Sequence, residues 1–293
     1  MRNALGALGR VLITLGLLIL LFVGYQLWGT GLYTARAQSD LEHDFDRQLE
    51  EVPTEGLEQS PPPPPEGDAV ARISIPKIGV DWIVVEGVAT ADLQKGPGHF
   101  PDTPMPGELG NAAIAGHRTT YGAPFHRLDE LAAGDEIVLT TLVGTFHYVL
   151  DENPFTVRPN QVEVLLPRGF PERPTEAQLT LTTCHPKYSA AQRLIVKATL
   201  DPDGSAVPTE STREPRGELE LAEGLSGDEA ARRPMTIFGL LVLAVGGLWW
   251  LGFHRYPRWT TWIVGAVPFL IVLFFFYTFL ERALGPYTNP FGS

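Results

Sequence analysis

Three long apolar runs are the strongest constraint on how this 293-residue chain can fold. They cover residues 11–33, 235–253 and 259–280. Each is long enough to cross about 30 Å of hydrocarbon as a helix. Arg2 and Arg10 form a basic flank before the first run, and the positive-inside rule places such a flank in the cytoplasm. The sequence therefore predicts a multi-pass protein of the cell membrane, with residues 1–10 cytoplasmic and the middle of the chain extracellular.

The first run has an alternative interpretation as a cleaved signal peptide. Residues 35–37 read Ala-Arg-Ala, which resembles a small-x-small cleavage site. The run is longer than the roughly 7–15 residues of a signal core, and an arginine lies inside the site, so an uncleaved anchor is favoured. Arginines flank both sides of the run at 235–253, which leaves the orientation of the C-terminal pair open. Three spans would place residues 254–258 in the cytoplasm and the tail at 281–293 outside.

Acidic residues are concentrated on either side of the middle segment. Residues 38–68 carry a net charge of −9 and residues 202–231 carry −6, whereas the whole chain carries −12. Like charges extend such segments, and the proline run at 61–65 forms a stiff polyproline II rod. We therefore expect a spacer at 34–68 and an acidic flexible linker at 202–234. This distribution leaves no basic surface that would favour nucleic-acid binding.

The first spacer contains one helical pattern. Leu41, Phe45 and Leu49 are spaced four residues apart in a charged background, which puts them on one face of a helix. A short juxtamembrane helix, a disordered segment and a flap over an active site all remain open.

The middle segment, residues 69–201, predicts one all-β domain flanked by transmembrane helices. Short β-branched segments bounded by Gly and Pro are typical of strands and turns. Strands are expected within 71–88, 111–117, 135–157, 162–167, 177–184 and 192–200, and the one short helix at 125–133. About seven strands with one short helix indicate a closed barrel or a sandwich. The absence of alternating strands and helices argues against a parallel nucleotide-binding sheet.

Cys184 is the only cysteine in the chain. It cannot form an internal disulfide, so it packs inertly, links two chains or reacts. Side chains alternate along the strand at 177–184, and Pro186 ends that strand, which predicts an accessible thiol at a strand end. Arg193 begins the next strand. An antiparallel return would bring its guanidinium to the thiol, where it can stabilise a thiolate or an oxyanion.

A thiol nucleophile also gains from a nearby imidazole. His117 is the best candidate, because it ends the apolar segment at 111–116 and precedes a Thr/Tyr/Gly loop. His43 and His254 lie outside the middle segment, His147 lies within a strand, and the others (His99, His126 and His185) are weaker candidates. The residues alone leave two interpretations open: a Cys184–His117–Arg193 site, or a buried and inert cysteine.

Two motifs resemble the signature regions of sortases, the cysteine transpeptidases of Gram-positive surfaces. They are NAAIAGHRTTYGAPF at 111–125 and LTLTTCHPKYSAAQRLIV at 179–196, and GPGHFPDTPMPGELGN at 96–111 resembles the family's preceding segment. The resemblance covers about 70–201 and implies an eight-stranded closed β-barrel with an active site of His117, Cys184 and Arg193. It is strongest to the class E housekeeping sortases of actinobacteria, which are associated with an LAxTG-type sorting motif in place of LPxTG.

This resemblance implies a two-step acyl transfer. No cofactor is expected, no metal-ligand spacing stands out, and calcium dependence stays open. The Cys184 thiolate would attack the Thr–Gly carbonyl of a sorting signal, His117 would exchange protons with the two amines, and Arg193 would hold the substrate. Thr183, Tyr121 and Tyr188 are candidate substrate-binding residues, with plain packing as the alternative for the tyrosines. The implied partners are surface proteins that carry a sorting signal, a lipid-linked peptidoglycan precursor or other amine acceptor, and the membrane.

Some features depart from class E. The C-terminal pair of apolar runs is better known from pilus-building class C enzymes, yet the Asp-Pro-aromatic triplet of their lid is absent from 38–70. Housekeeping anchoring is therefore favoured over pilin polymerisation. Hydrolysis of the same thioester stays open, as does a non-catalytic envelope scaffold in which Cys184 is idle. An L,D-transpeptidase would need a Ser-His-Gly-Cys run, and a transporter would need charges within its spans.

Overall fold

The computed structural model of the protein describes residues 2–52, 62–170, 172–211, 213, 225, 229–253 and 259–284. The chain forms two compact units. The helical unit comprises residues 1–29 and 227–285, and the barrel unit comprises residues 30–226 and 286–293. The predicted cytoplasmic turn at 254–258 and most of the tail at 281–293 lie outside the described residues.

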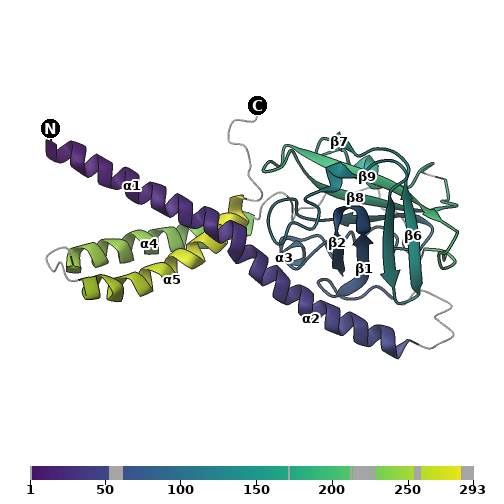
Figure 1. Cartoon of the computed structure of the whole chain (residues 1–293), viewed down its shortest axis with the longest axis horizontal. Coiled ribbons are helices and arrows are strands. Elements are labelled where there is room, and N and C mark those ends of the chain that lie inside the picture. The colour runs from purple at the N-terminus through teal and green to yellow at the C-terminus, as the bar shows by residue number, and fades with distance from the viewer. Residues whose placement is uncertain are drawn as a thin grey trace. The chain divides into compact units, whose positions relative to one another are not determined.

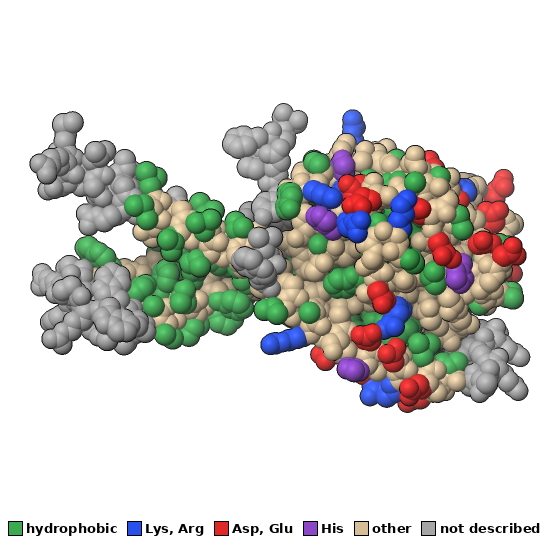
Figure 2. Space-filling view, in the orientation of Figure 1, with side chains coloured by type: hydrophobic (Ala, Val, Ile, Leu, Met, Phe, Trp, Pro, Cys, Tyr) green, Lys and Arg blue, Asp and Glu red, His purple; other side chains and the backbone are tan. Residues whose placement is uncertain are grey.

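The helical unit consists of α1 (Arg2–Gly24), the π-helical turn η1 (Tyr25–Gly29), α4 (Arg232–Phe253) and α5 (Trp259–Leu284). Apolar side chains cover the visible face of these helices (Figure 2). Among the described residues one helical stretch, Arg232–Gly252, is long and apolar enough to cross a membrane. The apolar stretches Leu12–Gly24 and Gly265–Leu280 are shorter. The three-span topology therefore stays a prediction.

The barrel unit begins with a long helix, α2 (Thr30–Glu51). Phe45 is fully buried and packs in a cluster with Ala69 and Ile83, next to Leu41 and Leu49. The segment that carries Leu41, Phe45 and Leu49 thus forms a helix. The apolar face of this helix packs on the barrel wall and not in the cluster that contains Cys184.

Nine strands form the sheet of the barrel unit (Figure 1). They are β1 (Ala69–Ile75), β2 (Val80–Glu86), β3 (Gly98–His99), β4 (Gly110–Ala115), β5 (Glu136–Thr141), β6 (Gly144–Leu150), β7 (Phe155–Val157), β8 (Ala177–His185) and β9 (Gln192–Asp201). Their order is β6-β5-β1-β2-β3-β4-β8-β9-β7, and β6 also pairs with β9. That pairing closes eight strands into a barrel, and β7 adds to β9. The predicted closed all-β barrel is confirmed.

The barrel interior is filled by the alternate side chains of its strands. Ile73 and Ile75 from β1 are fully buried in one cluster with Leu139, Phe146 and Leu181 from other strands. Burying such large aliphatic and aromatic side chains contributes about 1.5–3 kcal/mol each. The core therefore fixes the register of the strands that carry the candidate site.

Two sequence predictions within the barrel unit are wrong. Residues 162–167 do not form a strand, because Val162–Leu165 is a 3-10 turn. Its carbonyls accept hydrogen bonds from side chains instead of a neighbouring strand: Asn111 donates to Leu165, and Lys197 donates to Val164. The predicted helix at 125–133 is only a three-residue 3-10 turn, Leu128–Glu130. The short helix α3 (Thr90–Leu93) and the strand β3 were not predicted, and β7 is a third strand within 135–157, where two were expected.

The segment after β9 differs from the expected flexible linker. We call residues 202–211 together with Arg213 the C-terminal strap, and backbone groups of residues 202–211 bond to the barrel. The parts of the predicted linker at 214–224 and 226–228 lie outside the described residues. Ala206 N–H donates to the Thr145 carbonyl at 2.9 Å, and Thr209 N–H donates to the Gly107 carbonyl at 3.1 Å. Because these are barrel groups, the strap is part of the barrel unit rather than a spacer.

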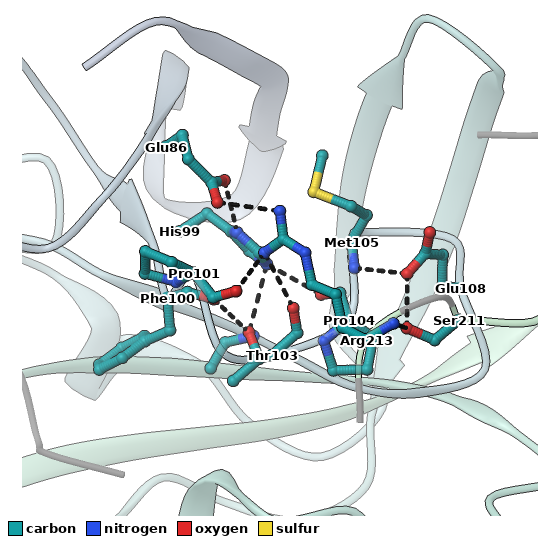
Figure 3. Close-up of polar contacts among 11 residues, drawn as sticks. Glu86, His99, Phe100, Pro101, Thr103, Pro104, Met105, Glu108, Ser211 and Arg213 are labelled. Atoms are coloured by element: carbon teal, nitrogen blue, oxygen red, sulfur yellow. Dashed lines mark hydrogen bonds and ion pairs between the residues drawn. The ribbon is translucent and has the colours of Figure 1, made fainter. Parts of the chain in front are cut away.

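An ion cluster holds the end of the strap (Figure 3). The Arg213 guanidinium lies 2.9 Å from one Glu86 carboxylate oxygen, and His99 Nδ1 lies 2.9 Å from the other. The Glu86 and His99 side chains are almost fully buried. Burial acts to raise the pKa of Glu86, but the hydrogen bonds and charges of His99 and Arg213 outweigh it and lower that pKa. Buried ionic groups are costly to leave unpaired, so this cluster is a strong attachment point.

Candidate active site

The parallel pairing of β4 and β8 brings His117 alongside Cys184. Ala115 is the last residue of β4 that pairs with β8, and its partner is Thr182. Beyond this pair, Gly116 N–H donates to the Thr182 carbonyl at 3.1 Å. Two residues further along each strand, the same register places His117 level with Cys184.

The antiparallel pairing of β8 and β9 brings Arg193 directly opposite Cys184. The predicted return of the chain is thus confirmed. Arg193 is 1% exposed, and its Nη1 donates to the carbonyls of Ala190 at 3.0 Å and Gln192 at 3.3 Å. Two main-chain acceptors therefore hold a buried cation beside the thiol. The fold gathers the three predicted residues at one end of β4, β8 and β9.

Burial controls the charge of both candidate proton carriers. Cys184 is 3% exposed, and desolvation raises the pKa of its thiol, although the charges of Arg193 and Arg118 oppose this. His117 is 4% exposed, and desolvation lowers its pKa to about 4. Its Nε2 has no hydrogen-bond partner within the described part of the chain. At neutral pH the thiol and the imidazole are therefore both uncharged. The prediction of an accessible thiol is wrong.

The three candidate substrate-binding residues have different surroundings. The Thr183 hydroxyl donates to the Gly116 carbonyl at 2.7 Å, so it ties β8 to the end of β4. The Tyr121 ring lies 5.0 Å from the His117 ring, and its hydroxyl accepts a hydrogen bond from Gln94 at 3.0 Å. Tyr188 is 60% exposed. Tyr121 is thus next to the site, whereas Thr183 is engaged in the scaffold and Tyr188 lies on the surface.

Arg118 is a site residue that the sequence analysis missed. It is 3% exposed, and its Nη1 donates to the Cys184 carbonyl at 3.1 Å and to His185 Nδ1 at 2.9 Å. Its Nη2 forms an ion pair with Asp129 at 3.0 Å. The signal in the sequence was its position directly after His117, the candidate imidazole.

Replacing Arg118 with methionine should shift the pH profile of thiol reactivity upward. The guanidinium favours the Cys184 thiolate, and without it the thiol should ionise at higher pH and react about tenfold more slowly at pH 7. Iodoacetamide alkylation of the full-length protein across pH 6–10 measures this. The matched control is Arg127→Met, which removes an exposed arginine that pairs with Glu130. An unchanged profile for Arg118→Met would contradict the assignment.

The other described histidines of the barrel bond to groups outside the Cys184–Arg193 pair. His99 contacts Glu86, His126 contacts the Arg118 carbonyl, His147 contacts Glu136, and His185 contacts the Arg118 guanidinium. His117 is therefore the histidine whose position in the strand register matches that of Cys184.

Comparisons with known proteins agree on one family. A family model described as a sortase domain matches residues 73–201. Sortase SrtE1 from Streptomyces coelicolor is 34% identical over 203 residues, which cover 65% of this chain and 55% of that protein. Sortase SrtE2 from the same organism is 31% identical over 236 residues, which cover 72% of this chain and 89% of SrtE2.

A solved structure of sortase E from Streptomyces avermitilis is 43% identical, with a TM-score of 0.42, and the match covers 46% of this chain and 90% of that one. This chain spans only 55% of the length of SrtE1. Because the match to SrtE2 extends over 89% of that relative and the sortase domain covers almost the whole barrel, this chain belongs to the sortase family and is class E-like.

Proposed function

We propose that this protein is a membrane-anchored cysteine transpeptidase. It would cleave the C-terminal sorting signal of a surface protein between Thr and Gly and transfer that protein to a cell-wall amine. The observation that carries the proposal is the convergence of Cys184, His117 and Arg193 at one end of three paired strands. The membership of the sortase family supports the same chemistry.

The first step forms a thioester. The thiol proton of Cys184 passes to His117, and the sulfur attacks the carbonyl carbon of the Thr–Gly bond. The C–N bond then breaks, and the imidazolium of His117 gives its proton to the departing amine. Because both groups are neutral at rest, creating a thiolate and an imidazolium in a dry site is costly. The buried cation of Arg193 offsets this by stabilising the thiolate and the oxyanion.

The second step transfers the acyl group. A primary amine of a lipid-linked peptidoglycan precursor attacks the thioester carbonyl, and the neutral His117 accepts the proton of that amine. The C–S bond breaks, and the imidazolium of His117 passes its proton to the leaving sulfur, which restores the thiol of Cys184 and the neutral imidazole. Water in place of the amine would give hydrolysis by the same route, so protection of the thioester from water favours transfer.

The helical unit would hold the enzyme near both substrates. The Arg232–Gly252 stretch is long enough to cross a membrane, and the proposed topology adds spans at 11–33 and 259–280 with the barrel outside. Sorting substrates and lipid-linked precursors are membrane-bound as well, so anchoring raises their effective concentration. Housekeeping anchoring is the proposed role in preference to pilin polymerisation, because the class E-like relatives cover most of the chain.

The test uses the full-length protein in detergent with two internally quenched peptides, one carrying LAxTG and one carrying LPxTG. Products are followed by mass, with and without an added amine acceptor. We expect cleavage between Thr and Gly, capture of the amine, and faster turnover of LAxTG. Cys184→Ala should lose all cleavage. Failure of the wild-type protein to cleave either peptide would sink the proposal and favour a non-catalytic envelope scaffold.

A further inference from the structure

The imidazole of His117 is packed against an aromatic ring. The centroids of the His117 and Tyr121 rings lie 5.0 Å apart, and the two ring planes are tilted by 36°. His117 Nε2 is buried and has no hydrogen-bond partner within the described residues. A catalytic imidazole is commonly oriented by a third group that hydrogen-bonds to its ring. Here the packing against Tyr121 can take that orienting role.

Tyr121 has a backbone conformation that its surroundings must enforce. Its φ of 51° lies in the left-handed region, and Gly122 (φ 72°) and Ala123 (φ 49°) continue the same turn. A bulky residue rarely adopts this conformation, and such strain concentrates at functional sites. A Cβ atom at Gly122 would lie 2.4 Å from the Trp82 ring, so the turn is packed tightly against β2. The position of Tyr121 is therefore closely defined.

Hydrogen bonds hold Tyr121 at both its side chain and its backbone. Gln94, which follows α3, donates from Nε2 to the Tyr121 hydroxyl at 3.0 Å. The Tyr121 N–H donates to Thr30 Oγ1 at 3.3 Å. Thr34 Oγ1 in turn donates to the Gln94 carbonyl at 2.8 Å. Thr30 and Thr34 are both buried residues of α2, so the beginning of this helix supports Tyr121 directly and through Gln94.

α2 is itself fixed to the barrel by the side-chain amide of Gln38. Its Oε1 accepts from the Ile83 N–H at 2.8 Å, and its Nε2 donates to the carbonyls of Ile83 at 2.9 Å and Lys95 at 3.0 Å. The amide thus satisfies both backbone groups of one β2 residue, as a neighbouring strand would. Thr30, Thr34 and Gln38 are spaced four residues apart, which places them on one face of the helix.

We propose that Tyr121 is a positioning residue for His117. Its ring sets the direction of the imidazole, and Gln94 and α2 hold that ring in place. The inference rests on the proposed function, because His117 must reach the Cys184 thiol and the two amines in turn. Misplacing a reacting group by about 1 Å can cost on the order of 10²-fold in rate. Loss of the ring should therefore lower kcat and leave the KM for the peptide unchanged.

The first measurement compares kcat and KM for the LAxTG peptide in the full-length protein in detergent. Tyr121→Leu removes the aromatic ring and should lower kcat roughly 10–100-fold at an unchanged KM. Tyr121→Phe keeps the ring and loses only the bond to Gln94, so kcat should stay within about threefold of the wild-type value. Thr34→Val removes the hydroxyl that supports Gln94 and should lower kcat by about threefold.

The second measurement needs no peptide. Histidine labelled with carbon-13 at Cε1 gives one NMR signal for each ring environment, and the His117 signal is assigned by its absence from His117→Gln. A ring packed on the imidazole shifts that signal. Tyr121→Phe should keep the shifted position. Tyr121→Leu should lose it and broaden the signal, because the imidazole then samples several orientations.

Two control variants and two other histidines separate positioning from general damage. Tyr33→Leu replaces a tyrosine of α2 that is 51% exposed, and Thr156→Val replaces an exposed threonine of β7. Both should keep the wild-type kcat, KM and His117 signal. The signals of His99 and His147 should be unchanged in Tyr121→Leu, which shows that the barrel is intact.

A raised KM with an unchanged kcat in Tyr121→Leu would overturn the inference, because Tyr121 would then bind the peptide. A wild-type His117 signal in that variant would also overturn it, whatever the rate. If the wild-type protein cleaves neither peptide, the proposed function fails. The NMR comparison still decides whether Tyr121 orients His117, so the two failures are distinguishable.

Discussion

Replacing His117 with glutamine should slow peptide transfer by about 10³-fold, because proton transfer by a positioned side chain is worth about 10²–10⁴-fold. Glutamine cannot carry the proton between the Cys184 thiol and the amines. The measurement is kcat for the LAxTG peptide at pH 7. His147→Gln is the matched control, since His147 is a partly exposed histidine on β6 that pairs with Glu136. It should keep the wild-type rate.

The same His117→Gln variant should be more resistant to acid than the wild type. Burial holds the pKa of His117 at about 4, against an ordinary value of 6.5. Between these values the unfolded chain binds a proton that the folded protein does not, so stability is lost as the pH falls from about 6.5 towards 4. This one group contributes a loss of about 2–3 kcal/mol by pH 4.5.

Urea unfolding of the full-length protein at pH 7 and pH 4.5 measures that loss. The fall in unfolding free energy between the two pH values should be about 2–3 kcal/mol smaller in His117→Gln than in the wild type. An equal fall in both proteins would show that His117 is not kept neutral by burial. An active His117→Gln enzyme would show that another group carries the proton.

Replacing Arg193 with methionine should lower kcat/KM by about 10³-fold, because removing one preorganised oxyanion donor costs about 10²–10³-fold. The loss of a cation that favours the thiolate adds to this effect. Arg193→Lys keeps the charge but not the planar fork of donors, so it should restore only part of the rate. The measurement is single-turnover cleavage of the LAxTG peptide, which isolates thioester formation.

Two controls separate this effect from misfolding. Arg158→Met removes an exposed arginine from the loop after β7 and should leave the rate unchanged. Thermal unfolding of Arg193→Met should remain near the wild-type midpoint, because methionine fills much of the same buried volume. Wild-type rates for Arg193→Met would remove Arg193 from the proposed mechanism.

Local patterns predicted most of the barrel. The strands β1, β2, β4, β5, β6, β8 and β9 all overlap segments whose β-branched, turn-bounded pattern indicated strands. The run at 162–167 has the same local pattern, yet it forms a 3-10 turn. Its carbonyls are satisfied by Asn111 and Lys197, residues from distant strands, and no local periodicity carries that information.

The sequence by itself determined three features of the site. Side chains alternate along β8, that strand ends next to Cys184, and the chain returns so that Arg193 lies opposite Cys184. Each feature depends on residues that are close together in the chain. Only the tertiary structure decided that the thiol is buried. Cys184 packs in an apolar cluster with Leu93 and Phe100, which lie more than 80 residues before it, and with Leu225, 41 residues after it. The exposure of a strand end depends on which distant segments pack over it, and that is a property of the assembled barrel.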